Sequence, residues 1–395
     1  MQRRAGASLP RMLRALYGEE ETESPDRDEI GNYEAHHSPR RWDATLYRPV
    51  INDVLWAQIP EWRTQVRWPE GKTFAACLTH DLDSVQIGSR RELWRTIRGF
   101  MRQSPRVAEK FRHAASLAGL RHAPLEMDLM TPWIEAERKL GFRSTFFVFP
   151  TRVTRRHPRD CVYRWDDPTW YRGERCSVRA MLRDVAELGW EIGLHGSLYA
   201  ALDADLLREQ KEDVETCIGQ PVGSTRQHNL RFEITQTPAA HAAAGLQTDS
   251  TLGFNRDVGF RNGIAYPFAL RHSPSREPVG TLEIPLVLHD GALLREDNLN
   301  LSAESAYRVC RRLIDRVAAT RGVITLLWHP DRLHHPHWFR VYERLLDDLA
   351  ERNAWGTTCK AIHDWWIGQG LNGLMERGLA TLAASLPPCA TSSPI

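Results

Sequence analysis

The sequence predicts an α/β protein whose strands form a barrel of seven or eight strands. Short apolar β-type runs recur between residues 73 and 362, helical patterns lie between them, and several runs end in an ionisable residue. Alternating strands and helices are typical of a parallel sheet. Seven or eight such strands over this length fit a (β/α) barrel better than an open sheet.

The expected elements follow one another in a regular order. Strands are expected at 73–81, 144–150, 190–195, 223–229, 246–251, 281–286 and 323–329, with 355–362 as a further candidate. Helices are expected at Trp133–Leu140, Val178–Leu188, Ala204–Ile218 and Ser302–Thr320. The polar, turn-rich residues 1–70 read as an irregular N-terminal extension, 71–368 as the barrel with a helical insertion at about 86–130, and 369–395 as a C-terminal tail.

Composition narrows the class of protein. A formal net charge of +2 argues against a dedicated nucleic-acid binder. The seven cysteines form no CxxC pair, which predicts reduced thiols and a cytoplasmic location. The N-terminus has no uninterrupted apolar run typical of a signal peptide, and no run is long enough for a membrane span.

Polar residues gather at the ends of the predicted strands. In a barrel, the carboxyl ends of the strands carry the chemistry. Ionisable side chains end five of the runs, namely His80, Asp81 and Asp83, then His195, then Arg226 and His228, then Asp249, and finally His329. One such residue is an ordinary strand-end polar group, but five at the same edge of the sheet predict a functional site.

Strand alternation places Asp81 and Asp83 on one face, with His80 on the other in a packing role. Two adjacent carboxylates repel each other unless a cation lies between them or one holds a proton. One carboxylate with His195 and His228 would supply three ligands and an open position, as in catalytic zinc sites. The other carboxylate could act as a general base.

These residues resemble the motifs of the NodB-type polysaccharide deacetylases, carbohydrate esterase family 4, from about Thr73 to Trp366. "THDLD", "STFFVFP", "GWEIGLHGS", "TRQH" and "LLWH" are similar to its successive motifs, and the combination resembles a divergent THDxD subgroup. The resemblance implies a distorted (β/α) barrel. It also implies roles for five residues: Asp81 as base, Asp83 and His195 as metal ligands, Arg226 holding Asp81, and His329 as general acid.

One position departs from the family pattern. The family has a second histidine four residues after the first, and here that residue is Tyr199, a poor zinc ligand. We expect His228, at the next strand end, to supply the missing imidazole. Zinc is the expected metal, and cobalt, nickel, manganese or iron could replace it.

The expected activity is metal-dependent hydrolysis of a C–N amide bond, most simply N-deacetylation of an acetylated sugar or glycan precursor. Two alternatives stay open: a small-amide or ureide hydrolase on the same fold, and a non-catalytic glycan-binding relative. Asp249 and Arg261, in the segment 249–268, are candidate substrate contacts. The basic segment 90–112 is either a solvated helix face or a lid for a substrate on an anionic carrier.

Overall fold

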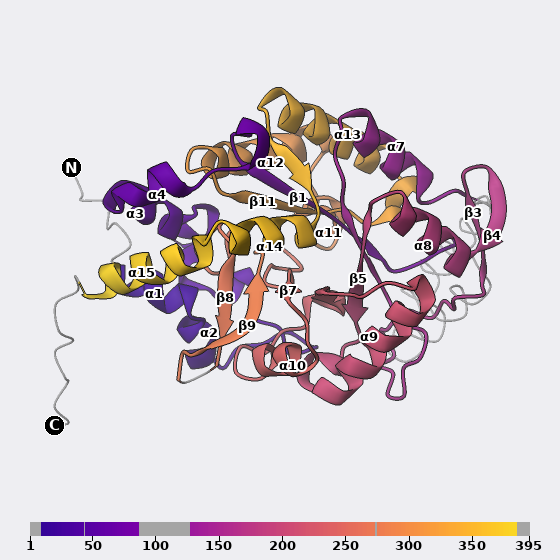
Figure 1. Ribbon diagram of the computed structural model, residues 1–395, viewed down its shortest axis with the longest axis horizontal. Helices are drawn as coiled ribbons and strands as arrows, with labels where there is room; N and C mark the ends of the chain where they lie inside the picture. Colours follow the sequence, from indigo (N-terminus) through magenta and orange to yellow (C-terminus); the bar gives the residue numbers. More distant parts are fainter. Residues whose placement is uncertain (1–8, 43, 87–126, 273–274, 385–395) are drawn as a thin grey trace.

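A computed structural model describes residues 9–42, 44–86, 127–272 and 275–384. Its centre is a curled, mostly parallel sheet (Figure 1). Eight parallel strands follow one another in the order β10, β11, β1, β2, β5, β6, β7, β9. They are β1 (Ala75–Leu82), β2 (Thr145–Val148), β5 (Glu191–Gly196), β6 (Ser224–Gln227), β7 (Thr248–Asp249), β9 (Pro278–Glu283), β10 (Leu288–His289) and β11 (Val323–Leu327).

The segment between β9 and β10 carries the chain from one side of the sheet to the other. Ile284 donates its backbone N–H to Asp249 of β7 at 2.8 Å, and Val287 donates to Thr325 of β11 at 3.3 Å. The sheet therefore curls round, which confirms the predicted distorted barrel. Two more strands belong to this sheet: β8 (Phe268–Arg271) is antiparallel to β9, and β12 (Trp355–Thr357) pairs with β1. A separate two-stranded sheet is formed by β3 (Pro168–Tyr171) and β4 (Glu174–Ser177).

Helices cover the outside of the sheet. All four predicted helices form, within two residues of the expected bounds: α7 (Thr131–Lys139), α8 (Val178–Glu187), α9 (Ala204–Ile218) and α12 (Ala303–Ala318). Side chains of Ser177, Asp203 and Ser302 cap the backbone N–H groups at the starts of the last three. Between residues 127 and 368, the structure has further helices that were not expected: α10 (Thr237–Ala243), α11 (Asp290–Leu294), α13 (Pro336–Glu351) and α14 (Cys359–Gly368).

Strand β1 is buried on both faces, as expected of a parallel strand. Its Ala76 and Leu78 pack in a core with the outer helices, whereas Ala75 and Cys77 face a second core that contains Trp366 of α14. Asp81 shares the face of Cys77, since side chains two apart point the same way. The carboxylate therefore lies on the inner side of the curled sheet.

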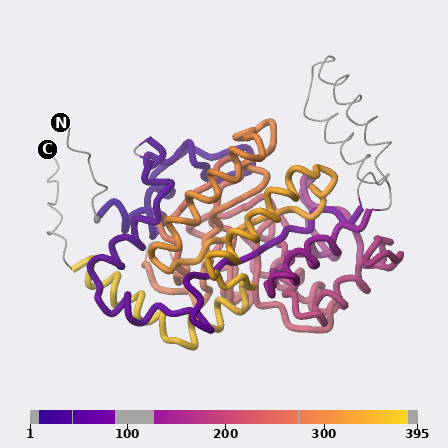
Figure 2. Tube along the Cα trace, turned by 90° about the horizontal axis from the view of Figure 1, so that it is seen from above, coloured from indigo at the N-terminus to yellow at the C-terminus, as the bar shows by residue number. Residues whose placement is uncertain are grey.

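The structure corrects the predicted ends of the chain. The residues 1–70 are not simply irregular, since they contain α1 (Leu9–Leu16), α2 (Glu19–Glu23), α3 (Val50–Gln58) and α4 (Pro60–Gln65). The predicted tail contains α15 (Leu371–Ala384), which lies near α1 (Figures 1 and 2). Leu371, Leu374 and Leu382 are buried, so apolar residues at helical spacing hold it on the core. The predicted insertion at about 86–130, with the basic segment 90–112, lies almost wholly outside the described residues.

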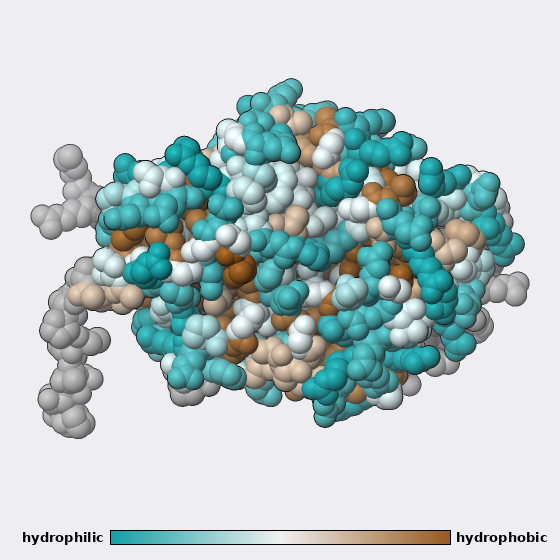
Figure 3. All heavy atoms as spheres, viewed as in Figure 1, coloured by the Kyte–Doolittle hydropathy of each residue, from teal (hydrophilic) through white to brown (hydrophobic). Residues whose placement is uncertain are grey.

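The visible surface is mainly hydrophilic. Figure 3 shows apolar residues scattered among hydrophilic ones on one face. The exposed large apolar side chains of the described residues are Trp42, Leu202 and Ile367, which are isolated in sequence. Among the described helices, none has the length and apolar character that crossing a bilayer requires.

Candidate active site

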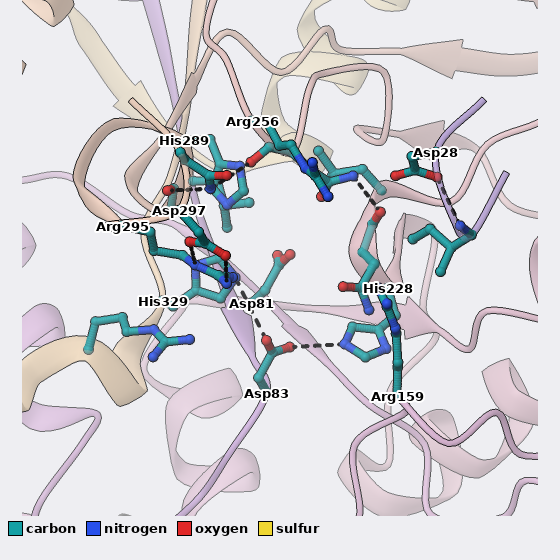
Figure 4. Close-up of a pocket in the computed structure, with 18 of the residues that line it drawn as sticks. Asp28, Asp81, Asp83, Arg159, His228, Arg256, His289, Arg295, Asp297 and His329 are labelled. Carbon is teal, nitrogen blue, oxygen red and sulfur yellow. Dashed lines mark hydrogen bonds and ion pairs between the residues drawn. The ribbon is translucent and has the colours of Figure 1, made fainter. Parts of the chain in front are cut away.

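A cavity of about 510 Å³ opens at the carboxyl ends of the strands (Figure 4). Strand-end residues line its floor: Asp81, Asp83, His195, His228, His289 and His329. The remaining lining residues come from the N-terminal extension and from segments that follow the strands: Asp28, Glu29, Ile30, Arg159, Asn229, Leu230, Asn255, Arg256, Gly291, Arg295, Asp297, Asn298 and Arg332, together with Leu327 at the end of β11. Segments far apart in the sequence thus build one pocket.

Asp83, His195 and His228 present donor atoms that all lie within 4.8 Å of one another. Oδ1 of Asp83 is 3.3 Å from Nε2 of His195 and 3.8 Å from Nε2 of His228. The other ring nitrogens face acceptors: Nδ1 of His195 is 2.9 Å from the Arg226 carbonyl oxygen, and Nδ1 of His228 is 3.3 Å from Oδ1 of Asp160. Because Nδ1 of each ring faces an acceptor, Nε2 is left directed toward Asp83, so the donor set fits a divalent metal.

Electrostatics couple this group tightly. Burial opposes ionisation of Asp83, but the hydrogen bond with His195 and the charges of His228 and His329 outweigh it and hold the pKa of Asp83 well below its usual range. Burial likewise disfavours a charged His195, but Asp81 and Asp83 outweigh it and raise the pKa of His195. A divalent cation would take the place of the proton on His195.

A strained turn aims His228 at the cavity. Asn229 and Leu230 directly follow His228 and have φ of 54° and 50°, in the left-handed region that costs non-glycine residues free energy. The carbonyl oxygen of Asn229 accepts hydrogen bonds from the side-chain amides of Asn32 at 2.8 Å and Asn255 at 2.9 Å. The N-terminal extension thus supports the turn that positions a candidate ligand. Tyr199 instead packs its ring against His157.

Asp81 is held by Arg226. Nη1 of Arg226 donates to Oδ1 of Asp81 at 3.0 Å and to Oγ1 of Thr79 at 2.7 Å. Its Nε and Nη2 donate to the carbonyl oxygen and hydroxyl of Ser250 at 2.7 and 2.8 Å. The guanidinium is fully buried. Its fixed orientation fixes that of the Asp81 carboxylate, whose Oδ2 lies 3.7 Å from Nε2 of His195.

His329 lies across the cavity from His228 (Figure 4). It forms an ion pair with Asp290. Nδ1 of His329 is 2.8 Å from Oδ1 of Asp290. Burial disfavours the imidazolium, but the charge and hydrogen bond of Asp290 outweigh it and raise the pKa of His329 to about 10. Burial also lowers the pKa of the neighbouring His289 to about 4, so that ring stays neutral. His329 therefore carries a proton that it could donate, and its Nε2 lies 3.8 Å from Oδ2 of Asp83.

His80 points away from the cavity, as predicted. Its Nδ1 is 2.7 Å from the Trp328 carbonyl oxygen and its Nε2 is 2.8 Å from Glu137 of α7. Glu137 also accepts hydrogen bonds from Ser144 and Trp190. These buried bonds fix strand β1 against the outer helices.

Asp249 and Arg261, the predicted substrate contacts, are not among the residues that line the cavity. Asp249 is fully buried and accepts a hydrogen bond from Thr251. Burial, followed by the charge of Asp249, raises the pKa of the adjacent Glu283. Arg261 is buried and donates to both carboxylate oxygens of Glu21, at 2.8 and 2.7 Å. Both side chains are therefore occupied by interactions inside the protein, Asp249 with Thr251 and Glu283 and Arg261 with Glu21.

Sequence reasoning missed several site residues. Asp290 follows the apolar run 284–288, so the strand-end pattern that found His329 could have found it. Asp160, beside His228, lies in a loop that carries no comparable signal. The contribution of Asp28, Glu29 and Ile30 depends on how the extension packs, which local sequence does not reveal.

Comparison with known proteins shows the fold. No family model and no curated protein sequence matches the chain. Among solved structures, one described as a "putative polysaccharide deacetylase from Mycobacterium smegmatis" superposes with a TM-score of 0.51 and 19% identity, covering 77% of this chain and 93% of that one. Puue allantoinase superposes with a TM-score of 0.50 and 12% identity, covering 76% and 93%. The predicted NodB-type fold is thereby confirmed, and the THDxD subgroup stays a prediction.

Proposed function

We propose that this NodB-type fold carries a metal-dependent hydrolase that cleaves a C–N amide bond, with N-deacetylation of an acetylated sugar as the reaction that fits best. The observation that carries the proposal is the convergence of a metal-type donor group, a held carboxylate and a protonated histidine in one cavity. Metal-assisted hydrolysis of an unactivated amide uses these three functions together, as electrophile, base and acid.

Asp83, His195 and His228 would hold the metal, with zinc as the first choice for two imidazoles and a carboxylate. When bound, the metal supplies Lewis-acid polarisation of the acyl oxygen and a water of lowered pKa. Asp81, oriented by Arg226, accepts the proton of the attacking water. His329 donates its proton to the leaving nitrogen, which otherwise departs poorly. The Asp290 carboxylate keeps that proton on His329 before the reaction.

The cavity supports a compact, hydrophilic substrate. Within the described part of the chain, its lining residues include no aromatic side chain apart from histidines, and residues 28–30 and 291–298 contribute to its walls. Cavities of about 300–1,000 Å³ hold small molecules rather than long polymers. A short glycan precursor or a monosaccharide fits this shape better than an extended polysaccharide.

A second candidate is a small-amide or ureide hydrolase, which the fold shared with Puue allantoinase and the modest volume of the cavity favour. Purified protein loaded with zinc should be incubated with N-acetylated sugars and, separately, with allantoin, and acetate release should be compared with ring opening of the ureide. Acetate release that requires metal supports the first proposal. A protein that retains no zinc after loading and dialysis would contradict both and favour a non-catalytic binding role.

A further inference from the structure

Two arginines on the cavity wall share one carboxylate. Arg159 donates to Oε1 of Glu29 through Nη1 at 3.3 Å and Nη2 at 3.2 Å. Nη2 of Arg256 lies 3.4 Å from both oxygens of the same Glu29. Arg159 follows β2 in the chain, Arg256 follows β7, and Glu29 belongs to the N-terminal extension. The three residues line the cavity together, and none of them belongs to the candidate metal or proton-transfer groups.

This cluster carries an excess of positive charge. Two guanidinium groups share the single carboxylate of Glu29, and Asp297, which also feels the charge of Arg256, is hydrogen-bonded to Arg295 instead. Arg295, also on the wall, differs, because Asp297 accepts from its Nε at 3.0 Å and its Nη2 at 2.7 Å and balances it fully. The side chains of Arg256 and Glu29 are about half exposed and that of Arg159 is about a third exposed, so their charges face the cavity and its solvent.

Arg256 has hydrogen-bond donors that are not used within the described structure, and hydrogen bonds hold its backbone in place. Within the described part of the chain, its Nε and Nη1 have no hydrogen-bond acceptor. The backbone N–H of Arg256 donates to Glu34 at 3.4 Å, and the side chain of the preceding Asn255 donates to Glu34 at 3.1 Å and to the Asn229 carbonyl oxygen at 2.9 Å. The guanidinium is therefore presented from an anchored loop, which reduces the entropy lost on binding.

We propose that Arg256 and Arg159 form a recognition site for an anionic group of the substrate, a phosphate or a carboxylate. This inference rests on the proposed function only for the position of the scissile amide. In Figure 4, Arg256 lies on the opposite side of the cavity from Asp83, so the anionic group would bind at one end of a small substrate while its amide lies at the other. A guanidinium matches phosphate and carboxylate oxygens with two parallel donors, whereas sugar hydroxyls need no net charge.

The test compares neutral and anionic probes on the zinc-loaded, full-length protein. Acetate release is measured with N-acetylglucosamine, N-acetylglucosamine 6-phosphate and N-acetylmuramic acid, which separates phosphate from carboxylate recognition. We expect KM for one anionic probe to be about tenfold or more below that for the neutral sugar, since hydrogen bonds to charged groups contribute that much. Arg256→Gln should abolish this difference and Arg256→Lys should keep part of it. Arg308→Gln, on the exposed surface of α12, is the matched control and should change nothing.

Equal KM values for neutral and anionic probes, or an Arg256→Gln variant that keeps the difference, would overturn the recognition site and leave the deacetylase proposal intact. Binding of inorganic phosphate, measured by calorimetry on the wild type and the same variants, separates the two ideas further. If no probe is hydrolysed but phosphate affinity falls about tenfold in Arg256→Gln, the reaction proposal fails and the anion site stands. Phosphate affinity and a KM difference between neutral and anionic probes that are both the same in wild type and Arg256→Gln overturn the site.

Discussion

The carboxylate of Asp290 forms hydrogen bonds with both the ring and the backbone of His329. Its Oδ1 is 2.8 Å from Nδ1 of the ring, and its Oδ2 accepts the backbone N–H of His329 at 2.9 Å. Although burial opposes ionisation, the charge of His329 lowers the pKa of Asp290 to about 2. In the proposed reaction this ion pair keeps a proton available beside the leaving nitrogen over most of the pH range.

Asp290→Asn should therefore narrow the pH range of activity. A general acid works while it is protonated, so activity declines as pH rises through the pKa of His329. Removing the charge of Asp290 leaves burial to lower that pKa, and the alkaline decline in kcat/KM should move to lower pH. Profiles from pH 5 to 11 check this, with the exposed Asp205→Asn as control. A variant whose alkaline limb stays where it is in the wild type would show that another group donates the proton.

Substitutions of Asp81 and Asp83 should have different effects on the zinc content of the protein. Asp81→Asn should lower kcat by about 10²–10⁴-fold while zinc stays bound, because Asp81 acts in proton transfer. Asp83→Asn should lose zinc, because Oδ1 of Asp83 is the atom that both histidine Nε2 atoms face. Zinc per chain and turnover are measured on the same preparations. The opposite pattern would mean that the two carboxylates have exchanged roles.

His228 should be required for metal binding, and Tyr199 should not. Asp160→Asn removes the carboxylate beside Nδ1 of His228 and should weaken zinc affinity about 10–100-fold, as loss of such a partner does elsewhere. His228→Ala should weaken it more. Tyr199→Phe is the control, since Tyr199 contacts His157 and Arg155 rather than the donor group. Competition with a chelator of known affinity measures these differences, and a zinc affinity that survives His228→Ala would exclude this ligand assignment.

The strands and the reacting groups could be read from the sequence because their signals are local. An apolar run that ends in "THDLD" or "LLWH" predicts both a strand and the polar side chain at its end. All eight expected strands form, and Asp81, Asp83, His195, His228 and His329 line one cavity.

Contacts between distant segments could not be read in this way. Asn32 supports the turn after His228 from 197 residues away, and nothing near either residue predicts the pairing. Asp249 ends its strand as Asp81 does, yet it faces Glu283 and Thr251 in the interior. Residue type at a strand end thus predicted where polar groups lie along the chain but not which of them face solvent.

Arg261 provides a last prediction, because its role can be decided by comparing stability with kinetics. Arg261 and Glu21 form a buried ion pair between the N-terminal extension and the segment after β7, with both side chains less than a tenth exposed. Arg261→Gln leaves the Glu21 carboxylate buried without its counter-ion and should lower the free energy of unfolding by about 3–5 kcal/mol. Urea denaturation measures this change.

The double variant Glu21→Gln, Arg261→Gln should lose less than the sum of the two single variants, because the second substitution removes the unpaired charge that the first creates. Below the unfolding transition, KM should equal that of the wild type, since neither residue lines the cavity. A raised KM with unchanged stability would instead restore Arg261 as a substrate contact. Measuring both the free energy of unfolding and KM therefore distinguishes a residue that holds the N-terminal extension on the barrel from one that contacts the substrate.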